Sequence, residues 1–112
     1  MDKLAQYRAY VQEVLQKYTS YPSTDPQIEK QLLCDTQHDH YQLLYLGWID
    51  NRHHEFSCLA HVDIKDSKIW IQWDTTEAGI ANKLVELGVP KQDIVLAFQP
   101  PYKRPLTEFA VG

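Results

Sequence analysis

The chain has few glycines and no long apolar run, and both shortages exclude classes of protein. Only 4 of its 112 residues are glycine, and no GxSxG, Walker or GxGxxG motif occurs. Glycine-rich phosphate-binding loops and the common nucleophile signature are therefore absent. No apolar stretch approaches the ~18–20 residues that cross a bilayer, and the N-terminus lacks the features of a signal peptide. The sequence predicts no membrane association and a cytoplasmic location.

Cysteines and basic residues are also scarce. The two cysteines, Cys34 and Cys58, lack CxxC spacing and lie in apolar surroundings, so we expect both to be reduced and buried. There are 11 Lys and Arg against 15 Asp and Glu, which gives a formal net charge of −4. A general nucleic-acid binder needs a basic surface. Contact with DNA is therefore predicted to be at most indirect.

The size and the N-terminal pattern predict one domain that begins with a helix. With 44 % hydrophobic and 23 % charged residues, the chain has the composition of a folded protein, and we expect a single domain over residues 1–112. Apolar residues recur at spacings of three and four between residues 4 and 18, which predicts an amphipathic helix. Residues 19–26 collect turn formers and two prolines and predict a linker.

Hydrophobic alternation with a period of two predicts four strands in the middle of the chain. The predicted strands cover residues 28–34, 41–49, 56–64 and 69–73. Their connections are too short for the crossovers that parallel strands need, so the strands should form antiparallel hairpins. Strict alternation places Phe56 and Cys58 on one face with Ala60, and it places Trp73 on the face opposite Trp70.

The pattern after the fourth strand returns to helix. Asp74, Thr75 or Thr76 can cap the start of a helix, with Glu77 at the third position if Asp74 is the cap. An apolar stripe over residues 80–87 continues this helix, and Gly88 followed by Pro90 provides a stop. Residues 94–98 predict a fifth strand or a short helix. The expected fold class is α+β: an antiparallel four- to five-stranded meander sheet with an N-terminal helix and a second helix packed on it.

The strands carry more aromatic surface than two helices can cover. The second strand is apolar on both sides, and Trp70 should lie on the face that helices leave open. Either the C-terminal tail folds back over this face, or another protein covers it. We expect the second case, with a homodimer or higher oligomer. The predicted partner-binding residues are Trp70, Tyr102, Lys103, Arg104 and Phe109.

Histidines and carboxylates predict neither a metal site nor a catalytic site. The histidines of residues 38–40 and 53–54 should lie at opposite ends of the second strand, roughly 30 Å apart, too far to share an ion. His61 is expected to be a hydrogen-bonded strand residue. Asp35 and Asp63 could form a metal-binding or acid–base pair only if the first and third strands were neighbours.

Three sequence blocks resemble a known family. They read HDHYQLLYLGW (38–48), HVDIKDSKIWIQWD (61–74) and TEAGIANKLVELGVPKQDIVLAFQPPYKRPLTEFAVG (76–112). Over essentially the whole chain they resemble the XisI-like proteins, excision controlling factors of the cyanobacterial fdxN element, with a departure at Gln99, where a histidine is common. The resemblance implies a cytoplasmic protein with a part in excision of a DNA element during heterocyst development. There a separate site-specific recombinase cuts, and a second factor, XisH, accompanies XisI.

Residues and resemblance together favour a non-enzymatic accessory protein without a cofactor. It would control DNA recombination through protein–protein contacts, as an oligomer and with an XisH-like partner. One alternative is a direct DNA-binding accessory, which would use Lys103 and Arg104 beside Tyr102, with Lys65 and Lys68 on a hairpin. Another is a metal-dependent hydrolase built on the Asp35, Asp63 and His61 side chains.

Overall fold

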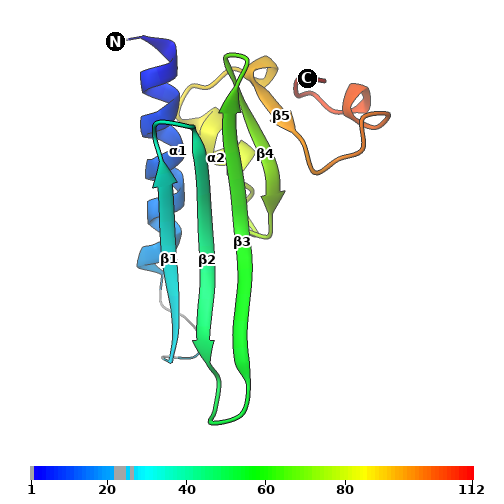
Figure 1. The fold of residues 1–112 in the computed structure, drawn as a ribbon. Coiled ribbons are helices and arrows are strands. Elements are labelled where there is room, and N and C mark those ends of the chain that lie inside the picture. The colour runs from blue at the N-terminus through cyan, green and yellow to red at the C-terminus, as the bar shows by residue number, and fades with distance from the viewer. Residues whose placement is uncertain (1, 22–24, 26) are drawn as a thin grey trace.

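Two helices lie on one face of a five-stranded sheet (Figure 1). The computed structural model describes residues 2–21, 25 and 27–112. The strand order is β1-β2-β3-β4-β5, which confirms the α+β class. The elements are α1 (Lys3–Ser20), β1 (Ile28–Asp35), β2 (His40–Trp48), β3 (His54–Lys65), β4 (Lys68–Asp74), α2 (Ile80–Glu86) and β5 (Ile94–Leu96), with short 3-10 turns at Lys91–Asp93 and Arg104–Leu106.

The helix α1 forms where the apolar stripe predicts it. The Asp2 carboxylate accepts a hydrogen bond from the Ala5 amide at 2.8 Å and so satisfies one of the free donors at the helix start. The buried residues of the stripe are Tyr7, Val11, Val14 and Leu15. The helix runs through Ser20, so the first two residues of the predicted linker are helical. Residues 22–24 and 26 of that linker lie outside the described residues.

The first four strands are antiparallel neighbours, as their short connections predict. The fifth joins differently, because β5 pairs with β4 in parallel and the chain between them contains α2. A parallel pair needs such a crossover, so the fifth strand is not part of the meander. The helix α2 begins at Ile80 with Gly79 as its N-cap, later than a cap at residues 74–76 predicts, and the Ile80 amide donates to the Asp74 carboxylate at 2.8 Å. Asp74 thus holds the helix start from six residues upstream.

Two β-bulges reverse the side-chain faces that strict alternation predicts. In β3, Leu44 pairs with Cys58 whereas Leu43 pairs with Ala60, so Leu59 is the extra residue. In β4 the pairing changes between His61 and Val62, whose partners are Trp73 and Ile71, so Gln72 is extra. A bulge inserts one residue and inverts the alternation beyond it. Phe56, Cys58 and Trp73 therefore lie on the face opposite Ala60 and Ile71, and the prediction was wrong for these three residues.

Both cysteines are free and neither is buried, contrary to the prediction. Cys34 lies near the end of the edge strand β1, next to polar residues of α1, and is exposed. Cys58 is half-buried because the bulge at Leu59 turns it away from the core. An edge position and a bulge thus explain the two exposures.

Ion pairs fix the first half of α1 to the β1–β2 turn and to the segment before β5. The Arg8 guanidinium donates to both carboxylate oxygens of Asp39 in the β1–β2 turn, at 2.8 and 3.1 Å. These hydrogen bonds lower the pKa of Asp39 against the opposing effect of burial. Near β5, burial acts to raise the pKa of Asp93, but a hydrogen bond from Tyr7 and the ammonium of Lys3 lower it overall.

The β2–β3 hairpin extends beyond the end of α1 (Figure 1). Gly47 near its tip has φ 148°, and a Cβ there would lie 2.5 Å from the Gln27 carbonyl oxygen. A side chain at position 47 would collide with the backbone of the residue that precedes β1, so this position requires glycine. Across the described part of the chain, no helix has both the length and the hydrophobicity to span a membrane.

Candidate functional site

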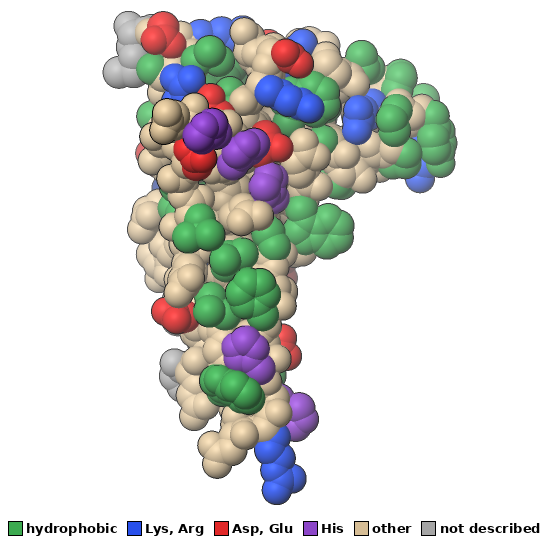
Figure 2. All heavy atoms as spheres, viewed as in Figure 1, with side chains coloured by type: hydrophobic (Ala, Val, Ile, Leu, Met, Phe, Trp, Pro, Cys, Tyr) green, Lys and Arg blue, Asp and Glu red, His purple; other side chains and the backbone are tan. Residues whose placement is uncertain are grey.

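The face of the sheet opposite the helices is open and largely apolar. Both helices pack on the other face, where the core residues of α1, α2 and the sheet form one cluster. We call the apolar residues of the uncovered face the open-face patch: Leu33, Leu44, Leu46, Trp48, Phe56, Cys58 and Trp73. Figure 2 shows these hydrophobic side chains along the middle and lower part of the sheet. The prediction that helices cover only one face holds.

Large hydrophobic side chains of the open-face patch are exposed to solvent. Four of its members are about half or more exposed: Leu33 at 47 %, Trp48 at 53 %, Phe56 at 63 % and Trp73 at 52 %. Cross-strand pairs join the middle of the patch, with Phe56 opposite Leu46 and Cys58 opposite Leu44. At its upper edge, Leu33 pairs with Gln42 and Trp73 pairs with His61. Single exposed hydrophobics are ordinary, whereas a contiguous set marks an interaction surface.

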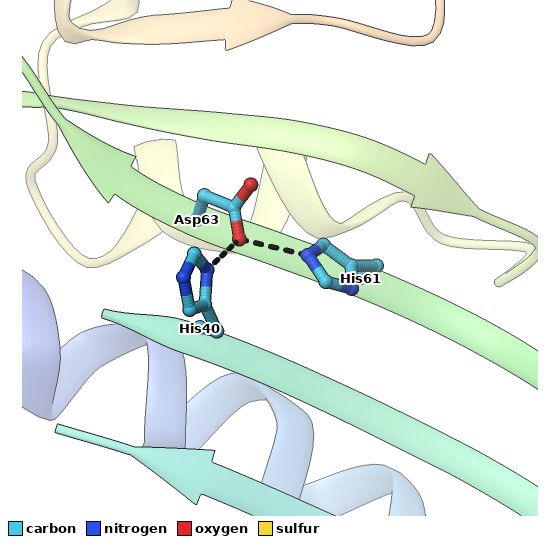
Figure 3. Close-up of side chains that lie close together, drawn as sticks. All are labelled: His40, His61 and Asp63. Atoms are coloured by element: carbon cyan, nitrogen blue, oxygen red, sulfur yellow. Dashed lines mark hydrogen bonds and ion pairs between the residues drawn. The ribbon is translucent and has the colours of Figure 1, made fainter. Parts of the chain in front are cut away.

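A polar cluster of His40, His61 and Asp63 lies on the same face, at the end of the sheet where β2 begins (Figure 3). One carboxylate oxygen of Asp63, Oδ1, accepts hydrogen bonds from His40 Nδ1 at 2.8 Å and from His61 Nε2 at 2.7 Å. His40 begins β2 and pairs directly with Asp63 in β3, while His61 precedes Asp63 by two residues and shares its face. The prediction that His61 is hydrogen-bonded is confirmed.

The surroundings of this cluster are negatively charged. The hydrogen bond to Asp63 raises the pKa of His40 above its ordinary value, and the charges of Asp35 and Asp39 act in the same direction. Gln42 approaches the other side of His61, with its Nε2 2.9 Å from His61 Nδ1. In this arrangement His61 donates to Asp63 through Nε2 and accepts from Gln42 through Nδ1.

The arrangement does not supply the Asp35–Asp63 pair. The strand β2 lies between β1 and β3, and His40 is the partner of Asp35 on one side and of Asp63 on the other. The condition for a carboxylate pair, that β1 and β3 be neighbours, is therefore not met. The Asp35 carboxylate instead contacts His38, at 2.9 Å.

Trp70 is partly covered by the chain's own tail. Its indole Nε1 donates to the Lys65 carbonyl at 3.1 Å, and the Lys65 ammonium lies 4.1 Å from the ring centroid. Arg104 lies 6.0 Å from the same ring, and Gly112 is also next to it. The tail therefore reaches the β4 end of the open face but leaves the open-face patch uncovered.

The other predicted partner-binding residues are in unlike environments. Tyr102 is 74 % exposed, and Lys103 beside it is also exposed. Arg104 donates to the carbonyl oxygens of Gln99 and Ala97 and so holds the tail loop together. Phe109 packs against the core. Among these four, Tyr102 and Lys103 have side chains that are free to meet a partner.

Sequence reasoning missed His40, Phe56 and Trp73 as members of one surface. The sequence pattern groups His40 with the loop histidines, although the alternation of β2 includes it as the residue before Tyr41. Strict alternation places Phe56 and Trp73 on the core side, because it takes no account of the two bulges. A signal was available in the pair His61-x-Asp63, whose spacing of two puts both side chains on one face.

These features define a class of protein: a small α+β protein with helices on one face of its sheet and an open apolar face on the other. The crystal structure of a XisI-like protein from Anabaena variabilis is similar to this chain, with a TM-score of 0.89 and 41% identity, covering 97% of this chain and 99% of that one. The fdxN element excision controlling factor XisI from Anabaena variabilis is also similar. Its TM-score is 0.86 at 37% identity, and the alignment covers 99% of this chain and 100% of that one.

The chain belongs to the XisI protein family, which matches residues 1–111. No curated protein matches it. The resemblance seen in the three sequence blocks is thereby confirmed.

Proposed function

We propose that this chain is a non-enzymatic controlling factor for excision of a DNA element and that it acts through protein–protein contacts. The observation that carries the proposal is the open-face patch, an exposed apolar surface on a chain of net charge −4. The family and the name of the 37% identical relative, an excision controlling factor, support the process. The sequence also lacks the motifs of common nucleophile and phosphate-binding sites.

A second copy of the chain is the first partner we propose for the open-face patch. An acidic protein repels its own copies, yet the patch is defined by seven uncharged side chains, so two patches can meet without opposing like charges. Exposed Trp and Phe are common anchors at the centre of interfaces. If a two-fold axis relates the two copies, the same residues of both copies lie in the interface.

An XisH-like protein is the second partner, and we place its contact at the tail. Tyr102 and Lys103 present an aromatic ring and a positive charge to solvent, with the Lys103 ammonium 5.9 Å from the ring centroid. Three further residues hold the tail in place. Arg104 lies beside the Trp70 ring and donates to the carbonyl oxygens of Gln99 and Ala97, and Phe109 packs against the core. A partner with an acidic and apolar surface would match this pair of side chains.

Co-purification with an XisH-like protein tests the tail contact. The Tyr102→Ala, Lys103→Ala double variant should lose capture of the partner while keeping the fold, because neither side chain lies in the core. A matched control is Tyr21→Ala, which removes a 55 % exposed tyrosine from the end of α1 and should leave capture unchanged. Capture by the double variant equal to that of the wild type would remove these residues from the proposal.

Direct DNA binding is a second candidate, favoured by one observation. Lys65 and Arg104 both lie beside the half-buried ring of Trp70, so two basic side chains and an aromatic ring share one place. Such a combination suits a phosphate and a stacked base. The Arg104 donors are largely used by backbone carbonyls, which leaves a small basic footprint. A gel shift at low salt decides: absence of retardation at micromolar protein would end this candidate.

A further inference from the structure

We propose that His40, His61 and Asp63 form a binding site for a zinc ion, a site that goes beyond the proposed protein contacts. The three side chains offer two imidazole nitrogens and a carboxylate oxygen within 4.8 Å of one another. Zinc prefers these ligands, and three protein ligands with one open position are typical of zinc sites that also hold water or a further group.

The observed distances are close to those that an ion requires. The His40 and His61 nitrogens lie 2.8 and 2.7 Å from the same Asp63 oxygen. In a tetrahedral site with bonds of about 2.0–2.1 Å, neighbouring ligand atoms lie about 3.3 Å apart. Each histidine nitrogen would therefore need to move about half an ångström away from the Asp63 oxygen to admit zinc in place of the two shared protons. The two nitrogens, which lie within 4.8 Å of one another, would need to come to the same spacing of about 3.3 Å.

The backbone holds these ligands on one rigid scaffold. His40 and Asp63 are direct cross-strand partners in the β2–β3 ladder, and His61 projects from the same face of β3. Sites on strands keep their geometry better than sites on loops, because the sheet fixes the positions of the Cα atoms. Little conformational entropy remains to be lost when the ion binds.

Gln42 supplies the outer contact that a zinc-bound histidine needs. Its side-chain amide lies 2.9 Å from His61 Nδ1. When zinc takes Nε2 of His61, Nδ1 carries the proton, and a rotated Gln42 amide accepts it through the carbonyl oxygen. Metal-bound histidines commonly donate their second ring N–H to such an acceptor, which fixes the ring.

Exposure and charge both favour entry of a cation. His40 is 58 % exposed at the surface end of the site, while His61 and Asp63 are 26 % and 17 % exposed. A shallow depression lined by Leu33, Gln42 and Asp35, among others, lies next to the two histidines. The His40 side of the site is therefore open to solvent, and the Asp35 carboxylate adds negative charge nearby.

Calorimetric titration of the untagged, metal-free full chain with ZnCl2 tests the site. We expect one ion per chain, and we expect Asp63→Asn and His61→Ala to abolish this binding. Gln42→Ala should weaken it about tenfold, the lower end of the effect expected for an outer-shell partner. The matched control is His53→Ala, which removes a histidine that also contacts an aspartate, Asp50, at 3.0 Å but lies in the β2–β3 connection.

A direct readout in the wild type keeps the test independent of how the variants fold. Long-range proton–nitrogen NMR of the imidazoles should show zinc-induced shifts at Nδ1 of His40 and Nε2 of His61, with His53 unchanged. Absence of zinc binding, binding unaffected by Asp63→Asn, or shifts at the histidines of residues 38 and 53–54 instead would each overturn the proposal.

Discussion

Replacement of Phe56 by glutamate should disrupt self-association while leaving the folded chain intact. Phe56 is 63 % exposed on the open-face patch. A fully buried aromatic side chain hides about 150–250 Å², so about 100–150 Å² of this ring remains available to a partner. At about 25 cal/mol per Å² this corresponds to an upper limit of about 4 kcal/mol for each copy.

The expected loss of affinity follows from that area. Truncation of an interface anchor typically costs about 2 kcal/mol or more, which raises the dissociation constant at least roughly thirtyfold. The carboxylate adds a desolvation cost, and in a symmetric dimer the change occurs in both copies. The folded monomer loses little, because the ring already lies in water.

Analytical ultracentrifugation over a concentration series measures this dissociation constant. The matched control is Gln16→Glu, which adds the same negative charge at an exposed position of α1, on the helix side of the molecule. We expect this control to associate like the wild type. Unchanged association of Phe56→Glu would refute the assignment of the interface, and equal weakening in both variants would show that net charge, rather than the patch, sets the affinity.

Three further predictions concern stability and are checked by thermal or denaturant unfolding. Gly47→Ala should destabilise the fold by about 1–3 kcal/mol, because the new Cβ would lie 2.5 Å from the Gln27 carbonyl oxygen and the backbone conformation is one that L-residues rarely adopt. Unchanged stability would contradict the close approach of these two backbone segments. Asp39→Asn should lower the unfolding midpoint by a few degrees, because the paired hydrogen bonds with Arg8 lose their charge, and Arg8→Ala should add little on top of it. Asp93→Asn should remove a pH-dependent part of the stability: the folded-state pKa of Asp93 is lowered by its α1 partners, so its contribution is present at neutral pH and declines below about pH 4. A wild-type advantage that stays constant down to acid pH would contradict this assignment.

The helices and the four antiparallel strands follow from local patterns. The stripe from Leu4 to Tyr18 has a helical period, and the connections between strands leave room only for hairpins. These features depend on neighbours in the chain, so one sequence is enough to predict them. The parallel pairing of β5 with β4 was missed because it depends on how α2 carries the chain across the sheet.

The candidate site was harder to predict because it depends on register. A bulge adds one residue and reverses the faces beyond it, so a strand read as strictly alternating places Phe56 and Trp73 in the core. His40 meets Asp63 only because β2 and β3 pair in one particular register. The role of Arg104 depends on two carbonyl oxygens, and backbone groups of this kind leave no trace in residue types.

The mass of the wild-type chain in solution tests the central claim most directly. Multi-angle light scattering behind size exclusion, over a range of concentrations, should give at least twice the 13.1 kDa of one chain. That result would mean that a second copy covers the aromatic side chains that the helices leave in water. A mass of 13.1 kDa that persists at the highest concentration would contradict the account.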